Sequence, residues 1–266
     1  MDIRTYYNQI AKMCFYAAWT CTGLAFLFFL LKVMKVLDTN VFFITGPFIL
    51  LSIFHFIGYR VYENRLINFP EMIVQKNSDL FKEENLLVTF LPAPTLRMLL
   101  FAPNGNLVGE VRDQNMKWYL WLIPSVLSII LPKKYGLYGA DGEMLAEYNL
   151  RGGIKQGVTM IVNGEAIGSF RQTYKEALFS FKGEISGQNG SEWMTVNPNK
   201  FFSNFEIKNQ TGVNIVTFQK GWMPREWSAI FKELNTPILT FHSSAQNNDK
   251  IVVLGYVASV YNHRSN

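Results

Sequence analysis

Cysteine and histidine are both scarce in this 266-residue chain. The two cysteines, Cys14 and Cys21, lie in one apolar run near the same helical face, too far apart for a mutual disulfide. The rest of the chain therefore has neither a disulfide framework nor a thiolate metal site. The three histidines, His55, His242 and His263, are well separated, so no cluster has metal-ligand spacing. We expect no metal and no cofactor.

Signatures of reaction chemistry are missing as well. The chain has no phosphate-binding loop, no dinucleotide fingerprint and no Gly-x-Ser-x-Gly nucleophile elbow. Arg151-Gly152-Gly153 lacks a strand–loop–helix context and predicts a tight turn. His242-Ser243-Ser244 offers a hydroxyl beside an imidazole, without a visible group to orient the base. The sequence predicts a non-enzymatic protein, with a membrane-bound hydrolase as the least favoured alternative.

The charge balance excludes one class of partner. Lys and Arg exceed Asp and Glu by 25 to 20, and this small surplus is spread along the chain. A nucleic-acid-binding surface would carry a concentrated basic patch. We expect no nucleic-acid partner and, at most, weak attraction to anionic lipid headgroups.

Two long uncharged runs lie near the N-terminus, Met13–Leu31 and Val41–Tyr59, each of 19 residues. A helix of ~20 apolar residues crosses a bilayer core. We therefore predict two transmembrane helices at 13–31 and 41–59, after a flank at 1–12 and before a linker or neck at 60–85. Basic residues outside the connector slightly outnumber those within it, which favours both termini in the cytoplasm. The prediction is a two-span cell-membrane protein with a cytoplasmic domain.

The period of the pattern changes from helical to strand-like near residue 86. Four turn signals interrupt short runs of Val, Ile, Phe and Tyr, at Asn104-Gly105, Asp141-Gly142, Asn163-Gly164 and Thr211-Gly212. Such turns join antiparallel strands into hairpins. Their unequal spacing excludes a solenoid or propeller of fixed period. Residues 86–266 are therefore predicted to form one antiparallel β-barrel or sandwich.

Three segments depart from this pattern. The uncharged stretch 118–132 begins with Trp118, Tyr119 and Trp121. Lys117 precedes it, and Lys133 and Lys134 follow it directly. It either rests on the bilayer as an interfacial segment or forms a buried crossover of the barrel. In the first case these lysines face anionic lipid, together with Arg151 and Lys155. In the second case they lie at ordinary solvated strand ends.

The other two segments lie near the C-terminus. The stretch 249–261 is apolar on every face and is expected to be buried, either as a helix or as a central strand. Trp222, Arg225 and Trp227 form a dense aromatic turn. This turn either caps the barrel or forms a ligand-binding lip.

The hairpin segments and the apolar tail together resemble a known superfamily. The residues that carry the likeness are 104–112 (Asn-Gly-Asn-Leu-Val-Gly-Glu-Val-Arg), Tyr135–Glu147 and the tail from Asp249. This order resembles the tubby C-terminal, phospholipid-scramblase and LURP-one-related superfamily, in particular small bacterial members with N-terminal membrane anchors. The resemblance covers roughly residues 86–262. It implies about twelve antiparallel strands closed around a buried C-terminal hydrophobic helix at Ile251–Tyr261, with Asn248 or Asp249 as N-cap. The acylated cysteines and calcium loop of eukaryotic scramblases have no counterpart in this chain.

Two functional hypotheses follow. In the first, the hairpin tethers a tubby-like barrel that engages lipid headgroups or a ligand at the cytoplasmic face. In the second, the chain is an accessory or sensor subunit whose hairpin packs against a membrane-protein partner such as a transporter. Small and polar residues along the two runs would serve such packing, namely Thr20, Thr22, Gly23, Thr45, Gly46 and Ser52.

Overall fold

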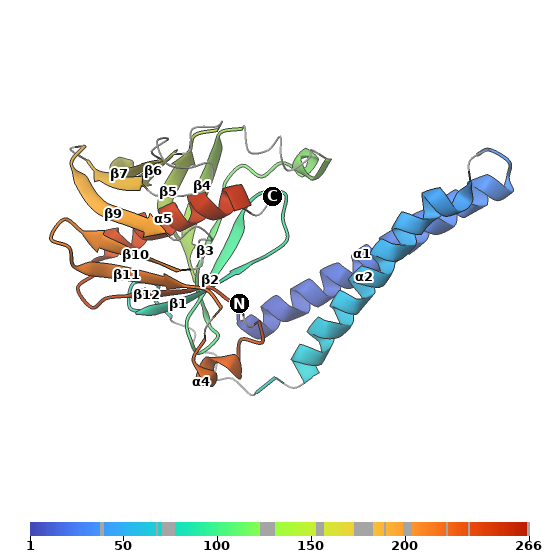
Figure 1. Cartoon of the computed structure of the whole chain (residues 1–266), viewed down its shortest axis with the longest axis horizontal. Helices are drawn as coiled ribbons and strands as arrows, with labels where there is room; N and C mark the ends of the chain where they lie inside the picture. The colour runs from blue at the N-terminus through green and yellow to red at the C-terminus, as the bar shows by residue number, and fades with distance from the viewer. Residues whose placement is uncertain are drawn as a thin grey trace. The chain divides into compact units, whose positions relative to one another are not determined.

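The computed structural model (Figure 1) resolves the chain into two compact units, residues 2–71 and residues 72–266 together with Met1. The structure describes residues 1–37, 40–67, 69–70, 78–122, 131–152, 157–172, 183–188, 190–198, 204–221, 223–233 and 235–264. The first unit is helical and the second is a β-barrel.

The helical unit is a hairpin of α1 (Ile3–Val33) and α2 (Val41–Ile67). Asp2 caps α1 by accepting a hydrogen bond from the backbone N–H of Thr5 at 2.8 Å. Both predicted spans lie inside these helices: α1 continues past its span at both ends, whereas α2 begins with its span at Val41 and continues past the C-terminal end. The first residues of the predicted neck therefore extend α2 as far as Ile67.

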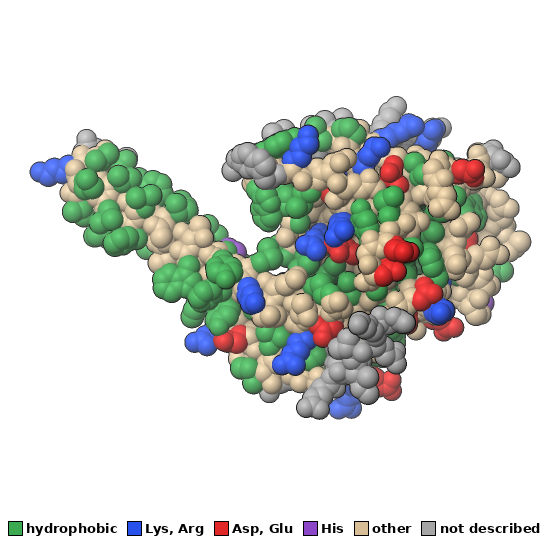
Figure 2. Space-filling view, turned by 180° about the vertical axis from the view of Figure 1, so that it is seen from behind, with side chains coloured by type: hydrophobic (Ala, Val, Ile, Leu, Met, Phe, Trp, Pro, Cys, Tyr) green, Lys and Arg blue, Asp and Glu red, His purple; other side chains and the backbone are tan. Residues whose placement is uncertain are grey.

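The hairpin exposes its apolar side chains. Phe43 is 82% exposed and Phe54 is 71% exposed. Hydrophobic side chains cover most of the hairpin on the face drawn in Figure 2, with Lys and Arg toward its ends. In the described chain, both helices are long and apolar enough to cross a membrane. A helix that is apolar all round needs either a protein core or a lipid environment.

Part of the predicted polar stripe serves the hairpin itself. The hydroxyls of Thr22 and Ser52 lie 2.7 Å apart, and Ser52 also donates to the carbonyl of Ala18 at 3.0 Å. The rings of Phe28 and Phe48 stack at 5.5 Å between centroids. Small polar side chains joined in this way hold two helices together where water is absent.

Twelve antiparallel strands form the closed barrel of the second unit. Each strand pairs with its neighbours in sequence, and β1 pairs with β12 to close the ring, with Leu86 opposite Leu239. The predicted fold is confirmed, including the number of strands. The strands are β1 (Asn85–Phe90), β2 (Arg97–Phe101), β3 (Leu107–Asp113), β4 (Lys133–Gly139), β5 (Met144–Leu150), β6 (Gly157–Val162), β7 (Glu165–Gln172), β8 (Gly183–Gly187), β9 (Glu192–Pro198), β10 (Asn204–Asn209), β11 (Asn214–Gln219) and β12 (Ile238–Phe241).

All four predicted hairpin turns join neighbouring strands. At the β6–β7 turn, Asn163 has φ 52° and Gly164 has φ 85°. Two consecutive positive φ angles match the right-handed twist of the flanking strands, and Asn followed by Gly adopts them at low cost. Two short helical segments interrupt the meander, a 3₁₀ helix η1 (Trp118–Leu122) and α4 (Arg225–Ser228).

The barrel is filled by α5 (Asn247–Arg264), drawn in red inside the strands in Figure 1. Every residue from Ile251 to Asn262 is buried. The helix starts earlier than the resemblance implied, so Asn248 and Asp249 lie within it and neither is the N-cap. Instead, the Asp249 carboxylate accepts a hydrogen bond from the backbone N–H of Gln246 at 2.8 Å, as the side chain at helix position N3 does in a capping box.

Candidate functional site

A cavity at one end of the barrel, here called the rim cavity, is lined by four of the nine predicted site residues. Its volume is about 570 Å³. Its lining comes from the end of β3, the start of β4, the end of β5 and the two ends of the 118–132 segment. The lining residues are Thr95, Asp113, Asn115, Lys117, Tyr119, Leu120, Leu131, Pro132, Lys133, Lys134, Asn149 and Leu150.

Strand register places two lysines on opposite sides of the barrel wall. Lys133 pairs with Leu150, and Lys134 pairs with Asn149. Because consecutive strand residues point to opposite faces, Lys133 turns inward, where it is 8% exposed, and Lys134 turns outward. Lys134 Nζ lies 3.8 Å from a carboxylate oxygen of Glu147 on the outer surface.

The inward lysine belongs to a buried polar group at the C-terminal end of α5. The side-chain oxygen of Asn262 accepts hydrogen bonds from Lys133 Nζ at 3.1 Å and from the Tyr135 hydroxyl at 2.7 Å. Burial lowers the pKa of Lys133, and the nearby Asp113 carboxylate opposes this shift. A cation at this position also faces the negative end of the α5 dipole. The floor of the cavity is therefore a positioned, partly desolvated ammonium group.

The outer lip of the rim cavity exposes apolar side chains next to basic ones. Trp121 is 59% exposed, Leu131 is 46% exposed and Tyr119 is 42% exposed. Lys117 Nζ lies 5.8 Å from the centre of the Tyr119 ring, within cation–π range. Aromatic rings beside lysines are typical of surfaces that meet a lipid headgroup layer.

Four of the six predicted membrane-contact residues line the rim cavity: Lys117, Tyr119, Lys133 and Lys134. Trp121 is on η1, and the side chain of Trp118 lies outside the described residues, as do residues 123–130. Arg151 is exposed just after β5, and Lys155 lies outside the described residues. The choice between interfacial contact and a buried crossover is therefore tested only at the ends of the segment, where Tyr119, Trp121 and Leu131 face solvent.

The predicted aromatic turn is only partly described. Trp222 lies outside the described residues, Arg225 is exposed and Trp227 is half-buried in α4. Phe231, which follows, is buried and contacts Phe101 edge-on at 6.1 Å.

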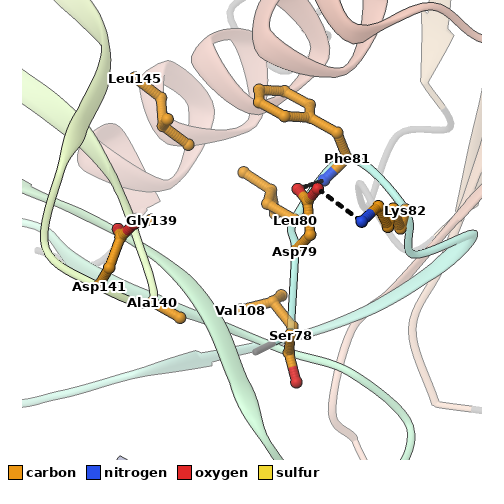
Figure 3. A pocket seen from close by; sticks show the side chains of 10 residues that line it. All are labelled: Ser78, Asp79, Leu80, Phe81, Lys82, Val108, Gly139, Ala140, Asp141 and Leu145. Carbon is orange, nitrogen blue, oxygen red and sulfur yellow. Dashed lines mark hydrogen bonds and ion pairs between the residues drawn. The ribbon is translucent and has the colours of Figure 1, made fainter. Parts of the chain in front are cut away.

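A second cavity, of about 320 Å³, lies where the neck enters the barrel (Figure 3). Leu80 is buried and lies between Val108 and Leu145, while the Asp79 carboxylate faces Lys82 at 3.6 Å. Lys250 holds the segment that precedes β1. Its Nζ donates hydrogen bonds to the backbone carbonyls of Phe81 at 2.8 Å and Glu83 at 2.6 Å. This cavity lies between the neck and the residues of β3, β4 and β5 near the β4–β5 turn, and its contacts are structural.

A third cavity, of about 400 Å³, includes His242 and Ser243. In the described part of the chain, the ring of His242 makes its hydrogen bonds through Nδ1, which accepts the backbone N–H of Ser244 at 3.3 Å and lies 2.8 Å from the Ser244 hydroxyl. This arrangement closes a turn, and no carboxylate of the described residues hydrogen-bonds the ring. Among the described residues, no group of three or more His, Cys, Asp or Glu side chains could hold a metal ion.

Sequence reasoning missed four residues in or beside the rim cavity. Asn262, Asp113, Asn149 and Thr95 were not predicted as site residues. Asn262 is 129 positions from Lys133, and only closure of the barrel around α5 brings the two together. The one available signal is a polar residue at the end of an otherwise apolar helix.

Comparisons with known proteins add little to this geometry. No family model matches the chain, and no curated protein matches it. A protein from Arabidopsis thaliana known from its X-ray structure is similar over 74% of this chain and 100% of its own, at 8% identity and a TM-score of 0.44. A likeness this weak does not assign a family.

Proposed function

We propose that this protein is a non-enzymatic, membrane-anchored member of the tubby and phospholipid-scramblase superfamily that engages lipid headgroups at the cytoplasmic face. The hairpin crosses the membrane twice, and the rim of the barrel is a second contact with the bilayer. The observation that carries the proposal is the outer lip of the rim cavity, where exposed Tyr119, Trp121 and Leu131 lie beside Lys117 and Lys134.

The physical case rests on two complementary terms. Aromatic and aliphatic side chains gain free energy by leaving water for the headgroup–acyl boundary. Each lysine near an anionic surface adds about 1 kcal/mol, and salt screens that attraction. The barrel supplies the rigid platform, because α5 and the closed ring of strands fix the ends of β3, β4 and β5 that carry the lip.

Flotation with liposomes tests this contact once the hairpin is removed. The fragment 69–266 contains all twelve strands and α5, and circular dichroism would confirm that it folds. We expect it to float with liposomes containing anionic lipid. Changing Tyr119, Trp121 and Leu131 to Ser should abolish flotation.

The matched control changes two exposed apolar residues elsewhere on the barrel, Met144→Ser and Val213→Ser. These side chains are 57% and 44% exposed, close to the values at the lip. Flotation should survive in this control. A folded, monodisperse fragment that ignores liposomes of every composition would refute the proposed contact.

An accessory subunit remains the second candidate, favoured by a specific feature of the hairpin. A Cβ built on Gly23 or Gly46 would have no atom within 4 Å among its neighbours, so both positions could admit the close approach of another helix. A stoichiometric membrane protein that co-purifies with the wild type and is lost from a Gly23→Leu/Gly46→Leu variant would support this function.

A further inference from the structure

The rim cavity has the size and the lining residues of a small-molecule binding site. Its volume of about 570 Å³ falls within the range of ligand pockets, roughly 300–1,000 Å³. One wall is apolar, formed by Tyr119, Leu120, Leu131, Pro132 and Leu150. Such sites typically combine apolar walls with a few positioned polar groups.

The polar groups favour an anion. Three lysines and one aspartate line the cavity, and the Asp113 carboxylate is engaged by the backbone N–H of Asn115 at 2.8 Å. Lys134 faces Glu147 on the outer surface, whereas Lys133 is buried on the inner side, held by Asn262. Hydrogen bonds between an ammonium and an oxyanion are about twice as strong as neutral ones.

A second polar atom at the cavity needs a partner. The side-chain oxygen of Asn149 is buried and has no hydrogen-bond partner among the described residues. Buried polar atoms in proteins are nearly always hydrogen-bonded. Because Asn149 pairs with Lys134, this oxygen lies on the other side of the wall from Lys133, and a hydroxyl group on the lip side of a bound molecule would supply the donor.

We propose that the rim cavity binds a single-chain anionic amphiphile, with its carboxylate or phosphate head beside Lys133 and its chain against the apolar wall. The inference deepens the proposed function and rests on it only for the supply of the amphiphile by the bilayer. It assigns the buried lysine to the ligand head and the outer lip to the membrane surface.

The test uses the full chain in phosphatidylcholine nanodiscs and dansylaminoundecanoate, a fluorescent fatty acid, with empty nanodiscs as the background. We expect saturable binding that decanoate and decyl phosphate displace and that decanol does not. Lys133→Met, which keeps the length of the side chain, should weaken binding about tenfold or more, as loss of a charge-assisted hydrogen bond does. The control Lys208→Met replaces an exposed lysine on β10 that does not line the cavity, and it should change affinity by less than about twofold.

A second variant keeps the test decisive if Lys133→Met does not fold. Leu131 is 46% exposed, so Leu131→Glu should fold and should weaken binding of the anionic probe by placing a like charge on the apolar wall. Unchanged affinity in both variants would overturn the proposal, as would displacement by decanol as effective as that by decanoate.

Two further comparisons separate the sources of the ligand and the two proposals. Adding lysophosphatidylglycerol, a single-chain anionic lipid, to the bilayer should displace the probe if bilayer lipids fill the cavity, and should leave it bound if free amphiphiles do. Flotation without probe binding would refute the cavity proposal alone. Probe binding without flotation would refute the membrane contact alone.

Discussion

Replacement of one glycine tests whether α5 is the core of the barrel. Gly255 lies in the middle of α5, and a Cβ built there would be 2.9 Å from Tyr148 Cε1 and 3.0 Å from Met160 Cγ. The Tyr148 ring has little freedom to move away, because its hydroxyl donates to the carbonyl of Ile251 at 2.8 Å. Gly255→Ala therefore adds a methyl group where no space exists.

Two effects of opposite sign determine the outcome. In an exposed helix interior, Ala is about 1 kcal/mol more favourable than Gly. Overpacking of a well-filled core costs about 1–3 kcal/mol. For Gly255→Ala we expect a net loss of roughly 1 kcal/mol in the free energy of unfolding. Gly255→Val should lose more, because it adds two further carbons and gains less in helix propensity.

Urea denaturation of the fragment 69–266, followed by circular dichroism, measures this effect. Asn248→Ala, at an exposed position in the first turn of the same helix, is the control and should change stability by less than about 0.5 kcal/mol. A Gly255→Ala variant that is more stable than the wild type by the full helix-propensity gain would show that this part of α5 is not enclosed. That result would refute the packing described above.

Three further predictions concern pH, charge and topology. Burial raises the pKa of Tyr135 and Tyr148 above the ordinary value of 10.0. Above that pH the unfolded state loses protons that the folded state keeps, so stability should fall as the pH rises. The buried residues Lys133 and Lys250 have a lowered pKa and oppose this trend only below about pH 10.5. Stability that stays constant in urea titrations at increasing alkaline pH would contradict the assignment. Changing Lys117 and Lys134 to Gln should weaken association of the fragment with anionic liposomes by about 2 kcal/mol at low salt, and an unchanged salt dependence would argue against electrostatic contact. A cysteine placed at exposed Ser243 in a cysteine-free full-length chain should resist a membrane-impermeant maleimide in intact cells and react after lysis; labelling of intact cells would place the barrel outside.

Local sequence signals were sufficient for most of the barrel. The Asn-Gly and Asp-Gly turns identify hairpins because few other residues adopt positive φ cheaply. The β8–β9 turn was not predicted, although Gly190 also has φ 72°. The flanking strand Gly183–Gly187 has two glycines and one isoleucine, so its intrinsic strand preference is weak and pairing with β7 and β9 determines its structure.

The central helix and the candidate site depend on contacts that no local pattern encodes. A segment that is apolar on every face suits a buried helix and a buried strand equally, and only enclosure by the barrel selects the helix. Lys117, Tyr119, Lys133 and Lys134 were identified because lysines flank an uncharged run whose first residues are aromatic. Their inner partner, Asn262, comes from the far end of the chain.

Membrane depth at the lip of the rim cavity is the most direct test of the proposed function. Spin labels would be placed at Leu131→Cys and, as the control, at Val213→Cys, in a full-length chain whose native cysteines are replaced and that is reconstituted in anionic nanodiscs. The side chains of Leu131 and Val213 are 46% and 44% exposed on the barrel. A difference in how oxygen and a water-soluble reagent reach the two labels therefore reports contact with the bilayer and not burial in the protein. We predict that the label at 131 is reached by oxygen and shielded from a water-soluble nickel reagent, and that the label at 213 shows the reverse. Two labels equally accessible to the nickel reagent would contradict contact between the rim and the bilayer.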